Sequence, residues 1–147
     1  MVNRNNIYMS EFLSKTIVIT GSSKGFGKEL AKEFLHKGHN VVICSKSAKN
    51  IREVSVELNT FENVLPLVID IQNYNDCKEL HDLTIERFDH VDILINNAAT
   101  NLNVRQDFLL FDQKEIDTVI GTNLIGLIYC HTVFLPPMIS RNEGVII

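Results

Sequence analysis

The sequence has few of the residues from which disulfide frameworks and metal centres are built. Its three cysteines, Cys44, Cys77 and Cys130, form no CxxC pair, and its five histidines form no HExxH or HxxxH motif. An odd number of separated cysteines is typical of a protein kept reduced inside the cell, so we expect a cytoplasmic location and no metal ion. The polar first fifteen residues lack the apolar run of a secretory signal but leave organelle targeting open.

Neither charge nor hydropathy indicates a nucleic-acid or membrane partner. The chain carries 14 basic and 18 acidic residues, a formal net charge of −4, and so has no overall basic field. The mostly apolar stretch 119–135 is interrupted by Asn123, Tyr129 and His131 and is shorter than the roughly 20 residues that a membrane span needs. With 147 residues and 45% hydrophobic composition, the sequence predicts one globular domain without a membrane span.

Short apolar runs alternate with helical patterns along the chain. Buried strands, apolar on both faces, are expected over residues 16–20, 40–44, 64–69, 91–95 and 144–147. Four helices are expected between them: one ended by Gly38, one around 51–58, one capped by Asn73, and a long one over 112–135 ended by Pro136 and Pro137. This alternation predicts an α/β fold, a Rossmann-type doubly wound parallel sheet with helices on both faces that stops after its fifth strand.

A glycine-rich stretch, Thr20 to Gly27 (TGSSKGFG), lies where the first strand turns into the first helix. Glycines allow the tight turn and the close approach of backbone to a phosphate, and the free N–H groups of the helix start favour an anion. The loop therefore predicts a dinucleotide pyrophosphate site, the alternative being a glycine-rich turn without a ligand. The residues expected at this site are Gly21, Ser22, Ser23, Lys24, Gly25, Phe26 and Gly27.

The glycine spacing and two later motifs resemble those of the short-chain dehydrogenase/reductase family. The loop is similar to the family's TGxxxGxG, Asn96-Asn97-Ala98-Ala99 to its NNAG with alanine in place of glycine, and Thr122 to Gly126 (TNLIG) to its helix with the catalytic-site asparagine. Within the family, the stretches 23–35, 95–103 and 122–130 resemble the chlorophyll b reductase branch. The resemblance implies a flexible extension over residues 1–15 and an NAD(P)-binding Rossmann domain over 16–147.

The same resemblance implies roles for polar residues outside the glycine loop. It places Asp70 and Ile71 beside adenine and Asn123 in a supporting catalytic role, and it adds Asn97, Ala98 and Ala99 to the cofactor site. Simpler roles remain open, because Asp70 could cap the next turn and Asn97 could cap the loop after its strand. Asn123 falls on the apolar face of the long helix, where its amide needs a partner such as backbone or ordered water.

The choice between the two nicotinamide cofactors can be argued from charge. Sites for NAD(H) place a carboxylate at the end of the second strand, where it accepts hydrogen bonds from the ribose hydroxyls. Here that place falls to Ser45, which Lys46 follows, and Lys24 lies in the glycine loop. No acid would repel a 2′-phosphate and two ammonium groups would attract it, so NADP(H) is favoured over NAD(H). The alternative is that both lysines are solvated surface residues.

The residues that the family uses for chemistry are missing from this chain. Its reaction is hydride transfer between nicotinamide and a carbonyl or alcohol carbon, assisted by a serine and a YxxxK pair that follow the fifth strand. Only Tyr74 and Lys78 have that spacing, and they precede the NNAA motif, so we regard the match as coincidence. The sequence thus predicts the NADP(H)-binding part of a reductase of small carbonyls or alcohols, inactive alone. The alternative is a non-catalytic nucleotide-binding module or a partner-binding subunit, and the helix 112–135 suits contact with a second copy.

Overall fold

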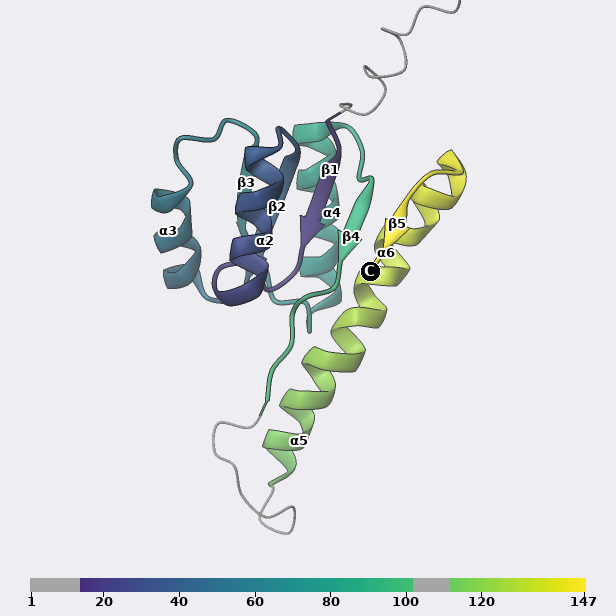
Figure 1. The fold of residues 1–147 in the computed structure, drawn as a ribbon. Coiled ribbons are helices and arrows are strands. Elements are labelled where there is room, and N and C mark those ends of the chain that lie inside the picture. The colour runs from purple at the N-terminus through teal and green to yellow at the C-terminus, as the bar shows by residue number, and fades with distance from the viewer. Residues whose placement is uncertain (1–13, 102–111) are drawn as a thin grey trace, which may run out of the picture.

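A five-stranded parallel sheet forms the centre of the molecule (Figure 1). The structure is a computed structural model that describes residues 14–101 and 112–147. The strands are β1 (Thr16–Ile19), β2 (Asn40–Ser45), β3 (Val64–Val68), β4 (Ile93–Ile95) and β5 (Val145–Ile146). Their order is β3-β2-β1-β4-β5, so the chain fills one half of the sheet and then returns to the other side of β1. This reversal confirms the doubly wound Rossmann-type fold and opens a crevice at the carboxyl ends of β1 and β4.

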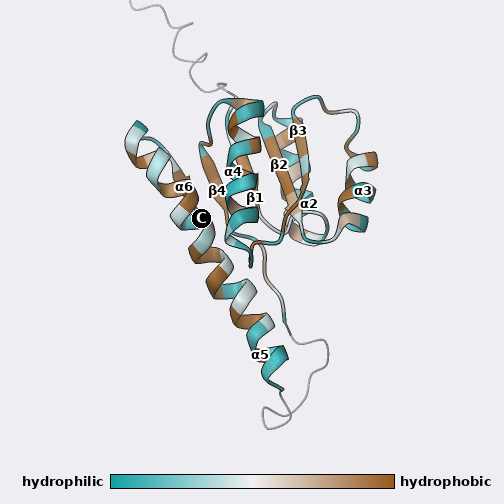
Figure 2. Cartoon of the chain, turned by 180° about the vertical axis from the view of Figure 1, so that it is seen from behind, coloured by the Kyte–Doolittle hydropathy of each residue, from teal (hydrophilic) through white to brown (hydrophobic). Residues whose placement is uncertain are grey.

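Helices cover both faces of the sheet, as the sequence predicts (Figures 1 and 2). The helices α2 (Gly25–His36) and α3 (Ala48–Glu57) lie on one face, and α4 (Tyr74–Phe88) and α6 (Leu127–Arg141) on the other. Asn73 caps α4, its side chain accepting a hydrogen bond from the N–H of Asn75, which confirms the predicted cap. The hydroxyl of Ser47 caps α3 in the same way through Asn50.

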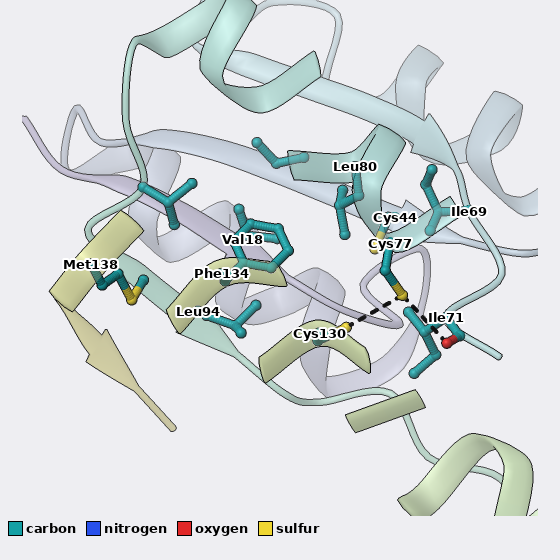
Figure 3. Close-up of a cluster of buried hydrophobic side chains, with 12 residues drawn as sticks. Val18, Cys44, Ile69, Ile71, Cys77, Leu80, Leu94, Cys130, Phe134 and Met138 are labelled. Carbon is teal, nitrogen blue, oxygen red and sulfur yellow. Dashed lines mark hydrogen bonds between the residues drawn. The ribbon is translucent and has the colours of Figure 1, made fainter. Parts of the chain in front are cut away.

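Side chains of β1 alternate between two hydrophobic cores. Ile17 and Ile19 pack under α2 and α3, whereas Val18 packs with Phe134 of α6 on the other face (Figure 3). All three β1 side chains are fully buried, which is the pattern of a central strand of a parallel sheet.

The strand β3 differs from the prediction that every strand is buried on both faces. Its residues are half-buried or exposed because, among residues 14–101 and 112–147, β3 pairs with β2 alone and so lies at the edge of the sheet. Pro66 lies opposite Ile43 of β2 and has no N–H to donate. Proline is tolerated on an edge strand, where its missing N–H can face away from the ladder.

The long fourth helix consists of three parts in the structure. An α-helical part, α5 (Gln113–Ile120), is followed by a π-helical turn, η3 (Gly121–Gly126), and then by α6. Asp112 begins α5 with a capping box that includes Glu115. The prediction that the prolines end this helix is wrong, because Pro136 and Pro137 lie inside α6, which runs to Arg141.

Burial of the last turn of α6 explains why the helix continues past its prolines. Met138 is buried in the same core as Phe134, so continuing the helix adds apolar burial that offsets the two lost backbone hydrogen bonds. The helix ends at Asn142, whose left-handed backbone (φ 54°) accommodates the C-terminal cap.

An 18-residue window of the helical segment Gln113–Arg141 has a mean hydropathy of 1.5, so the segment is long and apolar enough to cross a membrane by length and composition alone; 22% of that window is buried in the structure. Core helices of globular proteins pass the same test. Here α6 buries Cys130, Phe134 and Met138 against the sheet. The expectation of no membrane span stays a prediction, as does the domain boundary at residue 16, since residues 1–13 lie outside the described part of the chain.

Candidate functional site

A cavity of about 480 Å³ lies at the carboxyl ends of the first four strands. This is where open α/β sheets bind ligands, at the point where the strand order reverses. Most of the residues predicted for the cofactor line it: Gly21, Ser23, Lys24, Gly25, Ser45, Lys46, Asp70, Ile71, Asn97, Ala98 and Ala99. The structure adds Cys44, Ser47, Asn50, Ile69, Thr100 and Thr122.

Two glycines of the loop after β1 have backbones that other residues rarely adopt. Gly21 has φ +64°, and a Cβ built there would lie 2.7 Å from the Cα of Ala98, so the loop and the end of β4 touch through this glycine. Gly25 has φ +58°, and a Cβ there would meet nothing within 4 Å. Gly25 also begins α2, so the open space in front of it faces the unpaired N–H groups of a helix start.

Three predicted loop residues lie outside the cavity lining, so their contact with the cofactor stays a prediction. The hydroxyl of Ser22 is buried, donates to the carbonyl of Ile19 at 2.5 Å and accepts from the N–H of Cys44 at 3.1 Å. A Cβ on Gly27 would collide with the amide of Asn97, so this glycine serves close packing. The ring of Phe26 is 74% exposed on the first turn of α2.

The side chain of Asn97 holds the glycine loop against the end of β4. Its amide nitrogen donates to the carbonyls of Thr20 at 2.9 Å and Gly21 at 3.2 Å. In return, the hydroxyl of Thr20 accepts from the N–H of Ala98 at 3.0 Å. Asn97 therefore does more than cap its own loop: it fixes the phosphate-loop geometry on one side of the cavity.

Replacing Asn97 tests this contact. We expect Asn97→Ala to lower the free energy of unfolding by about 1–3 kcal/mol, because the two carbonyls lose their donor in a partly buried place. Asn59→Ala, in an exposed turn, is the control and should change it by less than about 0.5 kcal/mol. Urea unfolding of both variants measures the difference, and equal midpoints would contradict this role for Asn97.

The neighbouring Asn96 links β4 to α6 and β5. Its amide nitrogen lies 3.1 Å from Nε2 of His131 and 3.2 Å from the carbonyl oxygen of Ile147. An amide has two hydrogens, so it donates one to each, and Nε2 of His131 serves as an acceptor. The place of His131 on the apolar face of the long helix predicts a packed core residue; in the structure His131 is half-buried and bonds to Asn96 at the end of β4.

Asp70 and Ile71 lie on the opposite wall of the cavity, in the turn between β3 and α4. The Asp70 carboxylate accepts from the N–H of Gln72 at 3.1 Å, so this side chain caps the turn while it also lines the cavity. The side chain of Gln72 donates to the hydroxyl of Thr122 at 2.9 Å. The turn is therefore tied to the π-helical part of the long helix.

Asn123 is exposed, which corrects the expectation of a buried amide on the apolar face. Its partner is backbone, as the sequence suggests: its oxygen accepts from the N–H of Thr100 at 2.8 Å and its nitrogen donates to the carbonyl of Thr100 at 2.9 Å. The π-helical turn that contains it widens the helix locally, and such turns occur frequently at functional sites. Asn123 thus anchors the segment after β4 beside the cavity.

Positive charge gathers where β2 ends. Lys24, just before α2, and Lys46, just after β2, line the cavity together with Ser45, the last residue of β2. Within the described residues, neither ammonium group has a side-chain partner. Ser47 and Asn50, at the start of α3, complete this end of the cavity. The cap position of Ser47 is the signal from which the sequence could have identified them.

Tyr74 and Lys78, which carry the YxxxK spacing, lie away from the cavity. The Tyr74 ring packs edge-on against that of Tyr129 of α6 at 5.4 Å between centroids, and Tyr74 and Lys78 lie in the first two turns of α4. Neither lines the cavity.

Comparisons with known proteins agree with this geometry. The family model for short chain dehydrogenase matches residues 15–147. An NADPH-dependent pterin aldehyde reductase from Arabidopsis thaliana is 31% identical over 91% of this chain, and the chlorophyll(ide) b reductase NOL from rice is 38% identical over 87% of it. A short-chain dehydrogenase/reductase from Burkholderia phymatum, solved in complex with NAD, superposes with a TM-score of 0.85 and is 27% identical over 92% of this chain and 48% of its own.

The chain spans only part of the length of these relatives. It covers 55% of the pterin aldehyde reductase and 38% of the rice reductase. The resemblance to the chlorophyll b reductase branch that the sequence suggests is confirmed by the rice protein.

Proposed function

Because the chain belongs to the short-chain dehydrogenase/reductase family, whose members bind nicotinamide dinucleotides, we propose that its cavity holds NADP(H) in a protein that reduces a carbonyl or oxidises an alcohol. The observation that carries the proposal is that Lys46 follows the end of β2, where an NAD(H) site would have a carboxylate, and lines the same cavity as Lys24 of the glycine loop. When bound, the cofactor supplies or accepts a hydride. The residues of this chain bind the cofactor and orient it.

The pyrophosphate is held by backbone rather than by side chains. The start of α2 presents its free N–H groups beside Gly25, in open space, and the helix dipole adds about half a positive charge there. Ser23 and Gly21 complete the wall. The contacts of Asn97 with the loop carbonyls keep these groups in place before the ligand arrives, which reduces the entropy lost on binding.

The 2′-phosphate is recognised by charge at the other end of the cavity. Lys24 approaches from the glycine loop and Lys46 from the end of β2, and Ser45 offers a hydroxyl donor between them. Each charge-assisted contact contributes about 1.5 kcal/mol at a partly solvated site. Two of them, about 3 kcal/mol together, correspond to a preference for NADP(H) of about 100-fold.

Reversing the charge of Lys46 tests the cofactor preference. Lys46→Asp replaces an attractive ammonium with a carboxylate that repels the 2′-phosphate and accepts from ribose hydroxyls, so we expect the preference for NADPH over NADH to fall by at least about tenfold. Lys49→Asp makes the same charge change on the exposed face of α3, outside the cavity lining, and should leave the ratio unchanged. Calorimetric titration with both cofactors measures the ratio. Equal affinities in the unchanged protein would contradict the proposal.

Asn123 is proposed as a supporting residue of the catalytic site. Its amide oxygen and nitrogen each bond to the backbone of Thr100, so we propose that it acts by holding that segment beside the cavity rather than by moving a proton. The proposed substrate is a small carbonyl or alcohol, bound on the Ala99–Thr100 side of the cavity. The names of the two relatives indicate an aldehyde reductase and a chlorophyll(ide) reductase, and they describe those proteins.

The outer face of the long helix is proposed as a contact between two copies of the chain. Its exposed apolar side chains recur at near-helical spacing along α5, η3 and α6: Ile116, Ile120, Leu124, Ile128, Leu135 and Ile139. A contiguous exposed apolar patch of this size is rare on the surface of a monomeric protein.

A charge placed in this stripe tests the contact. Ile120→Lys puts an ammonium in the middle of the stripe, so we expect the sedimentation coefficient to fall from that of a dimer to that of a monomer. Val56→Lys, on the exposed side of α3, is the control and should leave the dimer intact. A monomer in the unchanged protein, or partition of that protein into lipid vesicles, would contradict the contact between copies.

For location, we propose the cytoplasm, which the three free cysteines support. The name of the rice relative gives a chloroplast location for that protein. A fluorescent fusion of the protein found in an organelle would contradict the proposal.

A further inference from the structure

Two of the three cysteines, far apart in the sequence, meet inside the core between α4 and α6. The sulfur atoms of Cys77 and Cys130 are 3.9 Å apart, and both side chains are completely buried (Figure 3). The sulfur of Cys77 also donates to the carbonyl oxygen of Ile71 at 3.4 Å. The Cys130 thiol therefore donates its hydrogen to the Cys77 sulfur, and the Cys77 thiol donates its own to the carbonyl oxygen of Ile71.

From this arrangement, we propose that Cys77 and Cys130 are a redox-active pair that a hydroperoxide converts to an intrachain disulfide, and that this change loosens the Ile71 wall of the cofactor cavity. The sulfurs need to approach from 3.9 Å to about 2.05 Å, a movement that side-chain rotation and a small shift of α4 toward α6 supply.

The two thiols differ in reactivity, and the difference sets the order of the steps. The hydrogen bond from Cys130 lowers the pKa of Cys77, against burial, which raises it. The same hydrogen bond raises the pKa of Cys130, and burial raises it further. Cys77 is therefore the thiol that becomes the nucleophilic thiolate first, and Cys130 is the thiol that attacks second. Burial raises the pKa of Cys44 to about 12, and its sulfur lies against the carbonyl oxygen of Ile19 rather than against another thiol, so Cys44 stays outside the pair.

The chemistry balances with hydrogen peroxide, the simplest hydroperoxide, as the oxidant. The Cys77 thiolate attacks one peroxide oxygen, the O–O bond breaks, and a sulfenic acid and one water form once the leaving oxygen is protonated. The Cys130 sulfur then attacks the Cys77 sulfur, the S–O bond breaks, and the second water leaves with the Cys130 proton. Two thiols are oxidised, one peroxide is reduced, and two waters result. Because both sulfurs are buried, the reaction proceeds through local opening of the core and is slower than at an exposed thiol.

The consequence for the cavity follows from the position of Ile71. Its carbonyl loses the Cys77 donor when the disulfide forms, and its side chain is already in tight contact with the long helix, since a Cβ on Gly126 would lie 2.8 Å from it. Ile71 lines the cavity beside Asp70. A shift of α4 toward α6 therefore displaces the wall that faces the adenine end of the proposed cofactor.

Mass spectrometry of the reduced 147-residue chain after treatment with excess hydrogen peroxide tests the pair. We expect a loss of two hydrogens, a crosslinked peptide containing Cys77 and Cys130, and only Cys44 still alkylated after unfolding. Cys44→Ala should behave in the same way, whereas Cys77→Ala and Cys130→Ala should lose no hydrogens. Three alkylated thiols, separate oxygen addition at Cys77 and Cys130, or disulfides between chains only would overturn the proposal.

Cofactor titration of the reduced and oxidised chain tests the coupling to the cavity, which rests on the proposed NADP(H) function. We expect the oxidised chain to bind NADPH about tenfold more weakly, as for one buried hydrogen bond left unmade, and reduction with dithiothreitol to restore the affinity. Equal affinities would overturn the coupling. If the reduced chain binds no NADPH, the proposed function fails, while the mass measurement decides the thiol pair independently.

Discussion

Gly25→Val is expected to abolish dinucleotide binding and leave the protein folded. The branched side chain would occupy the open space in front of the α2 start, where the pyrophosphate must approach the backbone N–H groups. A loss of at least about 100-fold in affinity corresponds to losing two or more charge-assisted hydrogen bonds. The left-handed backbone at φ +58° adds about 1–2 kcal/mol of strain, which circular dichroism and urea unfolding would reveal separately from binding.

The chain offers a matched control for the strain. Gly38, at the other end of α2, also has a left-handed backbone (φ +80°) and open space where its Cβ would lie. Gly38→Val should therefore lose a similar amount of stability and keep its affinity for the dinucleotide. Unchanged binding in a folded Gly25→Val protein would show that the loop is only a structural turn.

Features set by local pattern could be predicted from the sequence. The alternation of apolar runs with helical stripes gives the order of strands and helices, and the glycine spacing from Gly21 to Gly27 marks the turn between β1 and α2. These features depend on residues within one or two turns of each other, whose conformational preferences act before the chain is folded. The cap of α4 at Asn73 belongs to this class.

Features set by distant contacts could not be predicted in this way. The position of β3 at the sheet edge permits Pro66, and burial of Met138 carries α6 past Pro136 and Pro137. Both outcomes depend on which elements become neighbours.

The roles of individual side chains depend on distant contacts even more strongly. Ser22 follows the glycine pattern but points its hydroxyl to Ile19 and Cys44, and Cys77 finds Cys130 across 53 positions. The sequence identifies most of the residues around the cavity, whereas the division between those that line it and those that support it requires the tertiary structure.

Phe134→Ala is expected to cause the largest loss of stability of any change considered. The Phe134 ring is 1% exposed, packs edge-on against His81 of α4 at 5.3 Å between centroids, and lies in the core between α6 and the sheet (Figure 3). Truncation removes its apolar burial and leaves a cavity, which together lower the free energy of unfolding by about 3–5 kcal/mol. Since a domain is stabilised by about 5–15 kcal/mol in total, this change alone removes a large part of it.

The long helix connects this loss to function. The same helix that Phe134 attaches to the sheet brings Thr122 to the cavity wall and Asn123 to the backbone of Thr100. A loosened α6 should therefore weaken dinucleotide binding as well as stability, although Phe134 lies outside the cavity lining. Val56→Ala, at a 72% exposed position of α3, also removes apolar atoms and should change stability by less than about 0.5 kcal/mol. Urea unfolding and calorimetric titration of both variants measure the two effects, and a loss below about 1 kcal/mol for Phe134→Ala would show that α6 is not held to the sheet through this ring.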